Sequence, residues 1–419
     1  MKHLIIIIFS SFFSTALSSQ HLTYIIKPDN HFTGISSFSE GAAKVEISHD
    51  STIAGEDSTW SSIGYIDTTG KLLFEKILDD AGNFHCGLAY IVKTLNDKTK
   101  YGFINKKGEI VIPCIYDEAE DFSCNRAAVN KNGIWQIIDK SGKIVMTDSL
   151  LITERQIVNA SAQTSEDEDV EPPAFRNGLM LACHDGKYGY VDTSGKVVLP
   201  FKYYNAFDFS DGISVVAIDT VDGSLLYKGK GYVDSLYNSL PSGPKEYKWT
   251  VIDTTGKVLY KFKEEEEAPD LNQYFSEGYI SFSVDSYKNG VMNKNGEIII
   301  PPQYENECFP FSDGVTIVQE DDNKDDGNKN GYLLVIDTLG NTISKIPFTN
   351  RYGIMYDSNQ KFQEGLMAVK INDEWGYVDK KGSFVIAPQF GTALDFNDSC
   401  AVVVTVEGKA AVIKNPLHN

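Results

Sequence analysis

The chain has 419 residues, and its 38 basic and 58 acidic side chains give a formal net charge of −20 at pH 7. This excess of acid argues against a nucleic-acid partner, because phosphate binding needs a basic stripe and none is visible. The acidic residues gather in runs at 165–171, 264–267 and 321–326, which we expect to be solvated loops.

The first 19 residues have the pattern of a secretory signal peptide. Lys2 precedes a mostly apolar run from Leu4 to Phe13, and small residues follow between Ala16 and Ser19. The run is too short to span a membrane as a helix. We therefore expect an exported mature chain, residues 20–419, in the periplasm, at the cell surface or secreted. We expect it to have no membrane span, and no lipid anchor, because no cysteine follows the run closely.

The rest of the chain is a tandem repeat. Nine segments begin with a phenylalanine that is followed by a turn and an apolar strand. They begin at Phe38, Phe84, Phe122, Phe175, Phe209, Phe275, Phe311, Phe362 and Phe396. The shortest spacing is 34 residues, so longer units carry insertions, the largest at 148–174, 219–248 and 347–361.

The unit that begins at Phe175 predicts three antiparallel strands, at 178–183, 187–192 and 196–199. Between the second and third, the turn Asp192–Lys196 fits a type I turn followed by a residue with positive φ. Gly195 adopts that conformation without strain, and the Asp192 carboxylate is placed to accept hydrogen bonds from the turn. Eight such hairpins occur, and the last unit degenerates near Lys409.

An aromatic residue followed by glycine recurs in the second strand. The pairs are Trp375-Gly376, Tyr188-Gly189 and Tyr101-Gly102. Glycine weakens a strand, so its repetition predicts that another backbone or a ring passes close by. We interpret these residues as structural rather than ligand-binding.

At these hairpins the chain resembles the WG repeat family, also called KWG repeats, of bacterial proteins. The resemblance extends from Phe38 to Lys414, although the namesake Trp-Gly pair is intact only at Trp375-Gly376. It implies an exported or envelope-associated all-β array that is presumed to mediate interactions. The motif contains no catalytic residue.

The sequence assigns no catalytic, cofactor-binding or metal-binding residue. Its near matches to phosphate loops and calcium loops lack essential positions, and its histidines are scattered singly. The six cysteines are Cys86, Cys114, Cys124, Cys183, Cys308 and Cys400. Stacked units would bring Cys86 near Cys124, which leaves open a disulfide or two free thiols.

The predicted fold is therefore all-β, with eight three-stranded antiparallel units and a partial ninth. We expect an open, twisted array, with a closed propeller-like ring as the alternative that removes the exposed end edges. The expected function is a non-enzymatic interaction module of the cell envelope. It would bind an unknown protein or glycan through exposed aromatic side chains or through a face built by the insertions. The alternatives are a glycan-active hydrolase, which needs a carboxylate pair in a cleft, and a structural spacer.

Overall fold

The computed structural model describes most of the chain after the predicted signal peptide. The described residues are 22–28, 31–53, 56–147, 173–222, 245–262, 266–267, 275–284, 288–306, 308–321, 331–348, 361–371 and 373–418. The signal peptide and nearly all of the insertion at 148–174 lie outside them. Every regular element among the described residues is a β-strand, which confirms the all-β prediction.

The first five units each contribute four strands. Unit 1 contains β2 (Phe32–Ile35), β3 (Ala42–Ile53), β4 (Glu56–Asp67) and β5 (Leu72–Lys76). Unit 2 contains β6 (Asp80–Ala81), β7 (Leu88–Leu95), β8 (Lys98–Asn105) and β9 (Ile110–Tyr116). Unit 3 contains β10 (Glu118–Ala119), β11 (Arg126–Lys131), β12 (Ile134–Asp139) and β13 (Ile144–Met146). Unit 4 contains β14 (Phe175–Arg176), β15 (Leu179–His184), β16 (Lys187–Asp192) and β17 (Val197–Tyr203). Unit 5 contains β18 (Asn205–Ala206), β19 (Ile213–Asp222), β20 (Lys245–Asp253) and β21 (Val258–Lys261).

The remaining units complete the ring. Unit 6 contains β22 (Glu266–Glu267), β23 (Tyr279–Val284), β24 (Lys288–Asn293) and β25 (Ile298–Tyr304). Unit 7 contains β26 (Val315–Asp321), β27 (Gly331–Asp337) and β28 (Thr342–Phe348), with a single bridge from Cys308 to Val318 in place of the short strand. Unit 8 contains β29 (Leu366–Ile371), β30 (Glu374–Asp379) and the first part of β31 (Phe384–Ala393). Unit 9 contains the second part of β31, β32 (Cys400–Thr405), β33 (Ala410–Lys414) and β1 (Tyr24–Ile26).

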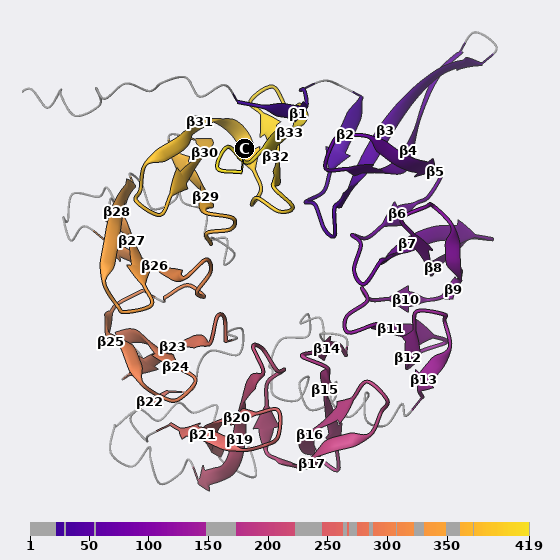
Figure 1. The fold of residues 1–419 in the computed structure, drawn as a ribbon. Helices are drawn as coiled ribbons and strands as arrows, with labels where there is room; N and C mark the ends of the chain where they lie inside the picture. Colours follow the sequence, from indigo (N-terminus) through magenta and orange to yellow (C-terminus); the bar gives the residue numbers. More distant parts are fainter. Residues whose placement is uncertain are drawn as a thin grey trace, which may run out of the picture.

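The units form a closed ring, with the fourth strands on the outer rim (Figure 1). The described strands make eight antiparallel sheets, and one six-stranded sheet contains both unit 8 and unit 9. In that sheet β31 changes partner, because its first part pairs with β30 and its last residues pair with β32. This arrangement is a β-propeller in which nine repeat units follow one another.

The N-terminal strand closes the ring. β1 pairs antiparallel with β33, with Tyr24 opposite Ile413 and Ile26 opposite Val412. Buried side chains of units 9 and 1 then share one apolar cluster, which includes Phe38 and Val412. The open array, our first expectation, is therefore wrong, and the closed ring is the arrangement found. Pairing with β1 removes the edge that an open array would expose on β33.

Two further corrections concern the units themselves. Most described units have four strands rather than three, because a strand of only two residues, such as β10 or β18, precedes the opening phenylalanine. Such a strand is too short to produce an alternating sequence pattern. The ninth unit is not partial either, since β1 supplies its outer strand from the other end of the chain.

The hydrophobic core lies between units rather than within them. The nine opening phenylalanines are at most 3% exposed. The described residues form nine apolar clusters, and each joins two successive units around the ring. In three units a buried tyrosine also donates its hydroxyl hydrogen bond to a carbonyl of the next unit, as Tyr190 does to Phe207 at 2.7 Å. Neighbouring units therefore complete each other's core, as stacked repeats require.

The two ends of the ring differ in how the strands are connected. The turns between first and second strands, and between third and fourth strands, lie at one end, which we call the tight-turn end. The connections between second and third strands, and the links between units, lie at the opposite end, which we call the insertion end. The insertions at 148–174, 223–244 and 322–330 leave the described strands at the insertion end.

Candidate functional site

The predicted turn at Asp192–Lys196 has the geometry that its sequence requires. Gly195 has a φ of +85°, and its amide donates to the Asp192 carbonyl at 2.9 Å. Asp192 Oδ1 accepts hydrogen bonds from the Ser194 hydroxyl at 2.6 Å, the Ser194 amide at 2.8 Å and the Lys196 amide at 3.1 Å. The hydroxyl bond is the main reason why the pKa of Asp192 lies below its usual value. Both residues serve the turn and not a ligand.

The same aspartate recurs in other turns, so we expect acid to weaken the ring through them. Side-chain hydroxyls also lower the pKa values of Asp67, Asp139 and Asp253. A lowered folded pKa stabilises the fold above the unfolded value of about 3.9, and this contribution is lost as the pH falls through the folded pKa. Replacing all four by asparagine should therefore flatten the fall in melting temperature between about pH 5 and pH 3.

The chain itself provides the rationale for asparagine as the replacement. Asn105 occupies the same turn position, and its Oδ1 accepts from the Lys107 and Glu109 amides at 3.0 Å. The asparagine variant should therefore melt close to the unmodified chain at pH 7, whereas alanine at the same positions should lower the melting temperature at every pH. An acid response identical to that of the unmodified chain would contradict this account.

The glycines of the aromatic-glycine pairs make room for a bulge in the outer strand. Between Tyr188 and Tyr190 the paired positions on β17 move from Tyr203 to Leu199, so two extra residues of β17 lie opposite Gly189. A Cβ on Gly189 would lie 2.7 Å from the Leu199 carbonyl oxygen. The same close approach of the outer backbone occurs at Gly102, Gly290 and Gly376. The nearest atom is a backbone carbonyl oxygen in all four cases, and at Gly189 the Phe201 ring also comes within 2.9 Å of the added Cβ.

The aromatic partners of these glycines belong to the packing. Tyr188 is 2% exposed and belongs to the cluster between units 4 and 5. Trp375 is half-buried against the cluster of units 8 and 9, and Tyr101 against that of units 2 and 3. The structure does not bring these predicted hallmark residues together into one site, because each serves its own unit.

The turns that follow the opening phenylalanines form a bonded circle, which we call the turn ring. Two successive residues in each turn have positive φ, for example Asp211 at +52° and Gly212 at +76°, as a two-residue hairpin turn requires. The side chain of the first accepts a hydrogen bond from the turn backbone of the following unit, as Asp211 does from the Gly278 amide at 2.9 Å. Glu40, Asn177, Glu277, Asp313, Glu364 and Asp398 make the equivalent contact.

Two cysteines replace the carboxylate in adjacent turns. Cys124 Sγ accepts from the Gly178 amide of unit 4 at 3.4 Å, and Cys86 Sγ lies 3.8 Å from the Phe122 carbonyl oxygen of unit 3. Both thiols are free. Each side chain points toward the following unit, so the two sulfurs follow one another instead of facing. Of the two alternatives left by the sequence, the structure has the free thiols.

Ionisable side chains near the turn ring pair between units. His85 Nε2 lies 3.4 Å from Asp121 Oδ2, and Arg176 Nε lies 3.5 Å from Asp208 Oδ2. Burial raises the pKa values of Asp121 and Glu120, and the His85 imidazole partly opposes the shift at Asp121. Of the two carboxyls, Asp121 pairs with His85 of the preceding unit. The polar contacts in and near the turn ring therefore hold neighbouring units together on the inner side of the propeller.

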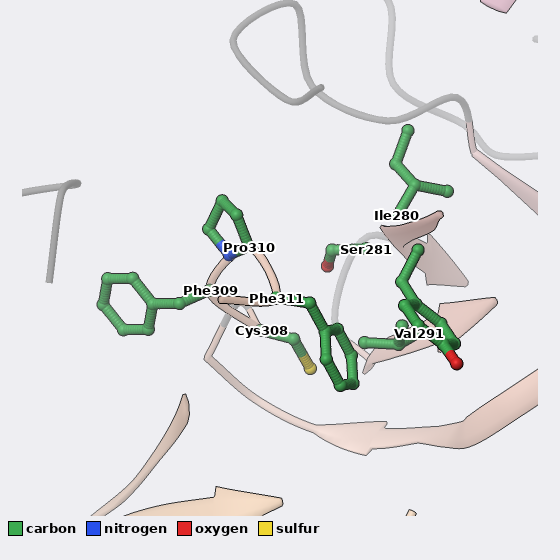
Figure 2. A pocket seen from close by; sticks show the side chains of 8 residues that line it. Ile280, Ser281, Val291, Cys308, Phe309, Pro310 and Phe311 are labelled. Atoms are coloured by element: carbon green, nitrogen blue, oxygen red, sulfur yellow. The ribbon is translucent and has the colours of Figure 1, made fainter. Parts of the chain in front are cut away.

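A small pocket lies between units 6 and 7 (Figure 2). Its empty volume is about 240 Å³, and it is lined by Tyr279, Ile280, Ser281, Val291, Cys308, Phe309, Pro310 and Phe311. Figure 2 shows the Cys308 thiol beside the Phe311 ring, while the Phe309 ring points away from them. The lining has no carboxylate or imidazole. The volume given includes open solvent, and the space left for the centres of water molecules is only about 10 Å³, which is room for about one water molecule.

One polar cluster on unit 1 combines residue types that hydrolases use. His49 Nε2 lies 2.9 Å from Ser62 Oγ and 2.7 Å from Glu75 Oε1, and the Ser62 hydroxyl donates to the same Glu75 oxygen. A catalytic triad needs one imidazole nitrogen for the nucleophile and the other for the acid. Here one nitrogen contacts both, and Ser62 is only 1% exposed. The cluster therefore lacks the geometry for nucleophilic catalysis.

The described residues contain no group of three or more histidine, cysteine, aspartate or glutamate side chains placed to hold a metal ion. Within those ranges there is also no helix long and apolar enough to cross a membrane.

Solved structures provide distant similarities. The chain is similar to BamB from Moraxella catarrhalis at 11% identity and a TM-score of 0.39, over 95% of this chain and 99% of that one. It is similar to Hsv2 from Kluyvelomyces marxianus at 11% identity and a TM-score of 0.34, over 74% and 94% of the two chains. It is also similar to the β-propeller domain of the Trilobed protease from Pyrococcus furiosus, at 8% identity and a TM-score of 0.31 over 76% and 95%. No curated protein matches with significance.

The family comparison agrees with the repeat geometry. The family described as WG containing repeat matches residues 63–98, 101–135, 188–219, 290–324 and 375–409. Four of these matches begin at or beside a second-strand glycine that faces a bulged outer strand, and they continue into the next unit. An aromatic residue precedes that glycine in three of them, and Asn289 precedes it in the fourth. The recurring feature is thus the glycine, the bulge opposite it and the opening phenylalanine of the following unit. The chain belongs to the WG repeat family.

Proposed function

We propose that this chain is a non-enzymatic, exported module of the cell envelope that binds a protein or glycan through the insertion end of its propeller. The observation that carries the proposal is the separation of the two ends. The turn ring and the Asp192-type turns use their polar groups on the chain itself. The insertion end instead receives the insertions at 148–174, 223–244 and 322–330, so the lengths of its connections differ from unit to unit while the strands repeat.

Most aromatic side chains are buried, which favours a binding surface at the insertion end over one made of many exposed aromatic side chains. Tyr65, Tyr190 and Tyr377 are fully buried, so most of the aromatic content belongs to the core. Among the large hydrophobic side chains that are exposed in the described residues, the aromatic ones are Trp60 and Tyr332. Loops on a rigid scaffold commonly carry recognition, because their sequence varies without cost to the core.

Affinity capture from the native envelope fraction tests the proposal. The bait is the mature chain from Gln20, compared with a variant in which residues 220–247 of the unit 5 insertion are replaced by Asn-Gly. Unit 3 makes its own two-residue turn with Asn132 and Gly133, both at positive φ, so the shortened hairpin follows a geometry already present in the chain. We expect one protein or glycan to be recovered by the full bait and lost or weakened with the trimmed bait.

A matched variant at the tight-turn end controls for effects of altering the surface charge of the bait. Lys196→Glu and Lys257→Glu lie in exposed turns of the tight-turn end. Recovery that is as strong with the trimmed bait as with the full bait, or that is lost only with these lysine variants, would contradict the proposal. Recovery of nothing specific by a folded bait would favour a structural spacer instead.

A further inference from the structure

We propose that the long hairpin of unit 1 holds a binding site for a neutral sugar ring, formed by Trp60, His49, Ser62 and Glu75. This inference rests on the proposed function, because it assigns a ligand class to one part of the insertion end.

The hairpin leaves the Trp60 side of this cluster open to solvent, while Ser62 is buried behind it and positions Glu75. β3 and β4 have 12 residues each, whereas the equivalent β7 and β8 of unit 2 have 8, and the pair extends beyond its neighbours (Figure 1). The outer strand β5 ends at Lys76, which pairs with Ile63. β5 therefore pairs with β4 only from Ile63 to Ile66, and Trp60 lies beyond the end of this pairing.

Trp60 is a fixed and open aromatic surface. Its indole stacks on the His49 imidazole with ring centroids 4.0 Å apart and an interplanar angle of 16°. It nevertheless remains 43% exposed. Trp135, Trp249 and Trp375 are instead half-buried against clusters between units. Stacking on His49 orients the Trp60 ring before any ligand arrives, which lowers the entropy lost on binding.

A carboxylate lies beside this ring. The His49 and Ser62 contacts both use Oε1 of Glu75, and the Glu75 side chain is 32% exposed. Oε2 takes part in neither of these two hydrogen bonds. The Ser62 hydrogen bond is the main cause of a lowered pKa of Glu75, so the carboxylate is ionised at neutral pH.

These groups select the ligand class. The C–H face of a pyranose can lie on an exposed indole, while its hydroxyls donate to a carboxylate at the ring edge. An anionic sugar or a phosphate would meet the ionised Glu75 and is disfavoured by like charge. A neutral sugar ring satisfies both the apolar surface and the acceptor.

Titration of the mature chain with maltohexaose, cellohexaose and chitohexaose tests the inference, followed by tryptophan fluorescence and calorimetry. We expect at least one neutral hexasaccharide to bind, and an oligogalacturonate of equal length to bind more weakly. Trp60→Ala should weaken binding by about tenfold or more, and Glu75→Gln by a smaller factor. Tyr332→Ala removes an equally exposed aromatic residue, 41% exposed on β27, and should leave binding unchanged.

Trp60→Ala and Glu75→Gln alter side chains that reach solvent, and thermal melting verifies that both variants are folded. The inference is overturned if none of the neutral hexasaccharides binds, or if Trp60→Ala and Glu75→Gln bind as tightly as the unmodified chain. Neither result would touch the capture of a protein that depends on the unit 5 insertion, so failure here and failure of the proposed function are distinguishable.

Discussion

A chain that begins at Lys27, and so lacks β1, should unfold at a clearly lower temperature than one that begins at Gln20, and it should self-associate. Removing β1 deletes the pairing of Tyr24 and Ile26 with β33 and takes Ile26, which is 8% exposed, out of the cluster between units 9 and 1. Loss of one buried isoleucine side chain alone costs about 2–5 kcal/mol. The uncovered edge of β33 is also open to pairing with another copy. Thermal unfolding and sedimentation measure the two effects.

Two matched chains separate the pairing from the mere loss of length. A chain that begins at Leu22 retains β1 and should behave like the longer one. Ile26→Ala keeps the backbone pairing but removes the side chain, so it should be destabilised without strong self-association. If the chain without β1 melted like the full chain and stayed monomeric, ring closure through β1 would contribute nothing to stability.

Gly376→Ala should lower the free energy of unfolding by about 2 kcal/mol or more, within the upper range for overpacked sites. The added Cβ would lie 2.6 Å from both the Ile386 carbonyl oxygen and the Pro388 nitrogen. Both contacts are backbone atoms of the bulged β31, so no side chain can rotate away, and β31 also continues into unit 9. Denaturant titration of the variant gives the loss directly.

Gly64→Ala is the control for this prediction. Gly64 occupies the same strand position in unit 1, but β5 pairs there without a bulge. Its nearest neighbours would be the Leu72 and Ile47 side chains, at 2.9 and 3.1 Å, and the Phe74 carbonyl oxygen at 3.1 Å, so its backbone contact is looser than the 2.6 Å contacts at Gly376. We expect a smaller loss than at Gly376. Equal losses at the two glycines would mean that the bulge does not explain the recurring glycine.

The turns and repeats could be predicted because they are local. The positive φ of Gly195 and the acceptor role of Asp192 follow from a few adjacent residues, and the aromatic-glycine pairs predict a close neighbour. The opening phenylalanines reveal the repeat because each occupies the same buried position. The turns and the three longer strands of each unit therefore needed no knowledge of distant contacts.

The features that were missed depend on distant or very short segments. The closure of the ring rests on three residues, Tyr24–Ile26, which pair with a strand at the other end of the chain. The circle of contacts such as Asp211 to Gly278 joins turns 67 positions apart, with no sequence signal beyond an acidic residue before glycine. The cluster around Trp60 depends on the end of β5 relative to β4, which a single strand pattern cannot indicate.

The closing pair has a consequence for how the protein is made. Tyr24 and Ile413 are separated by 389 positions, whereas the other sheets are assembled from strands close together in sequence. During synthesis, units 1 to 8 can therefore form one after another, while β1 waits without its partner until the last strand emerges. Closing this long loop costs conformational entropy, although the cost rises only logarithmically with loop length. Contacts of high sequence separation form slowly, so we expect ring closure to be the final and slowest step of folding.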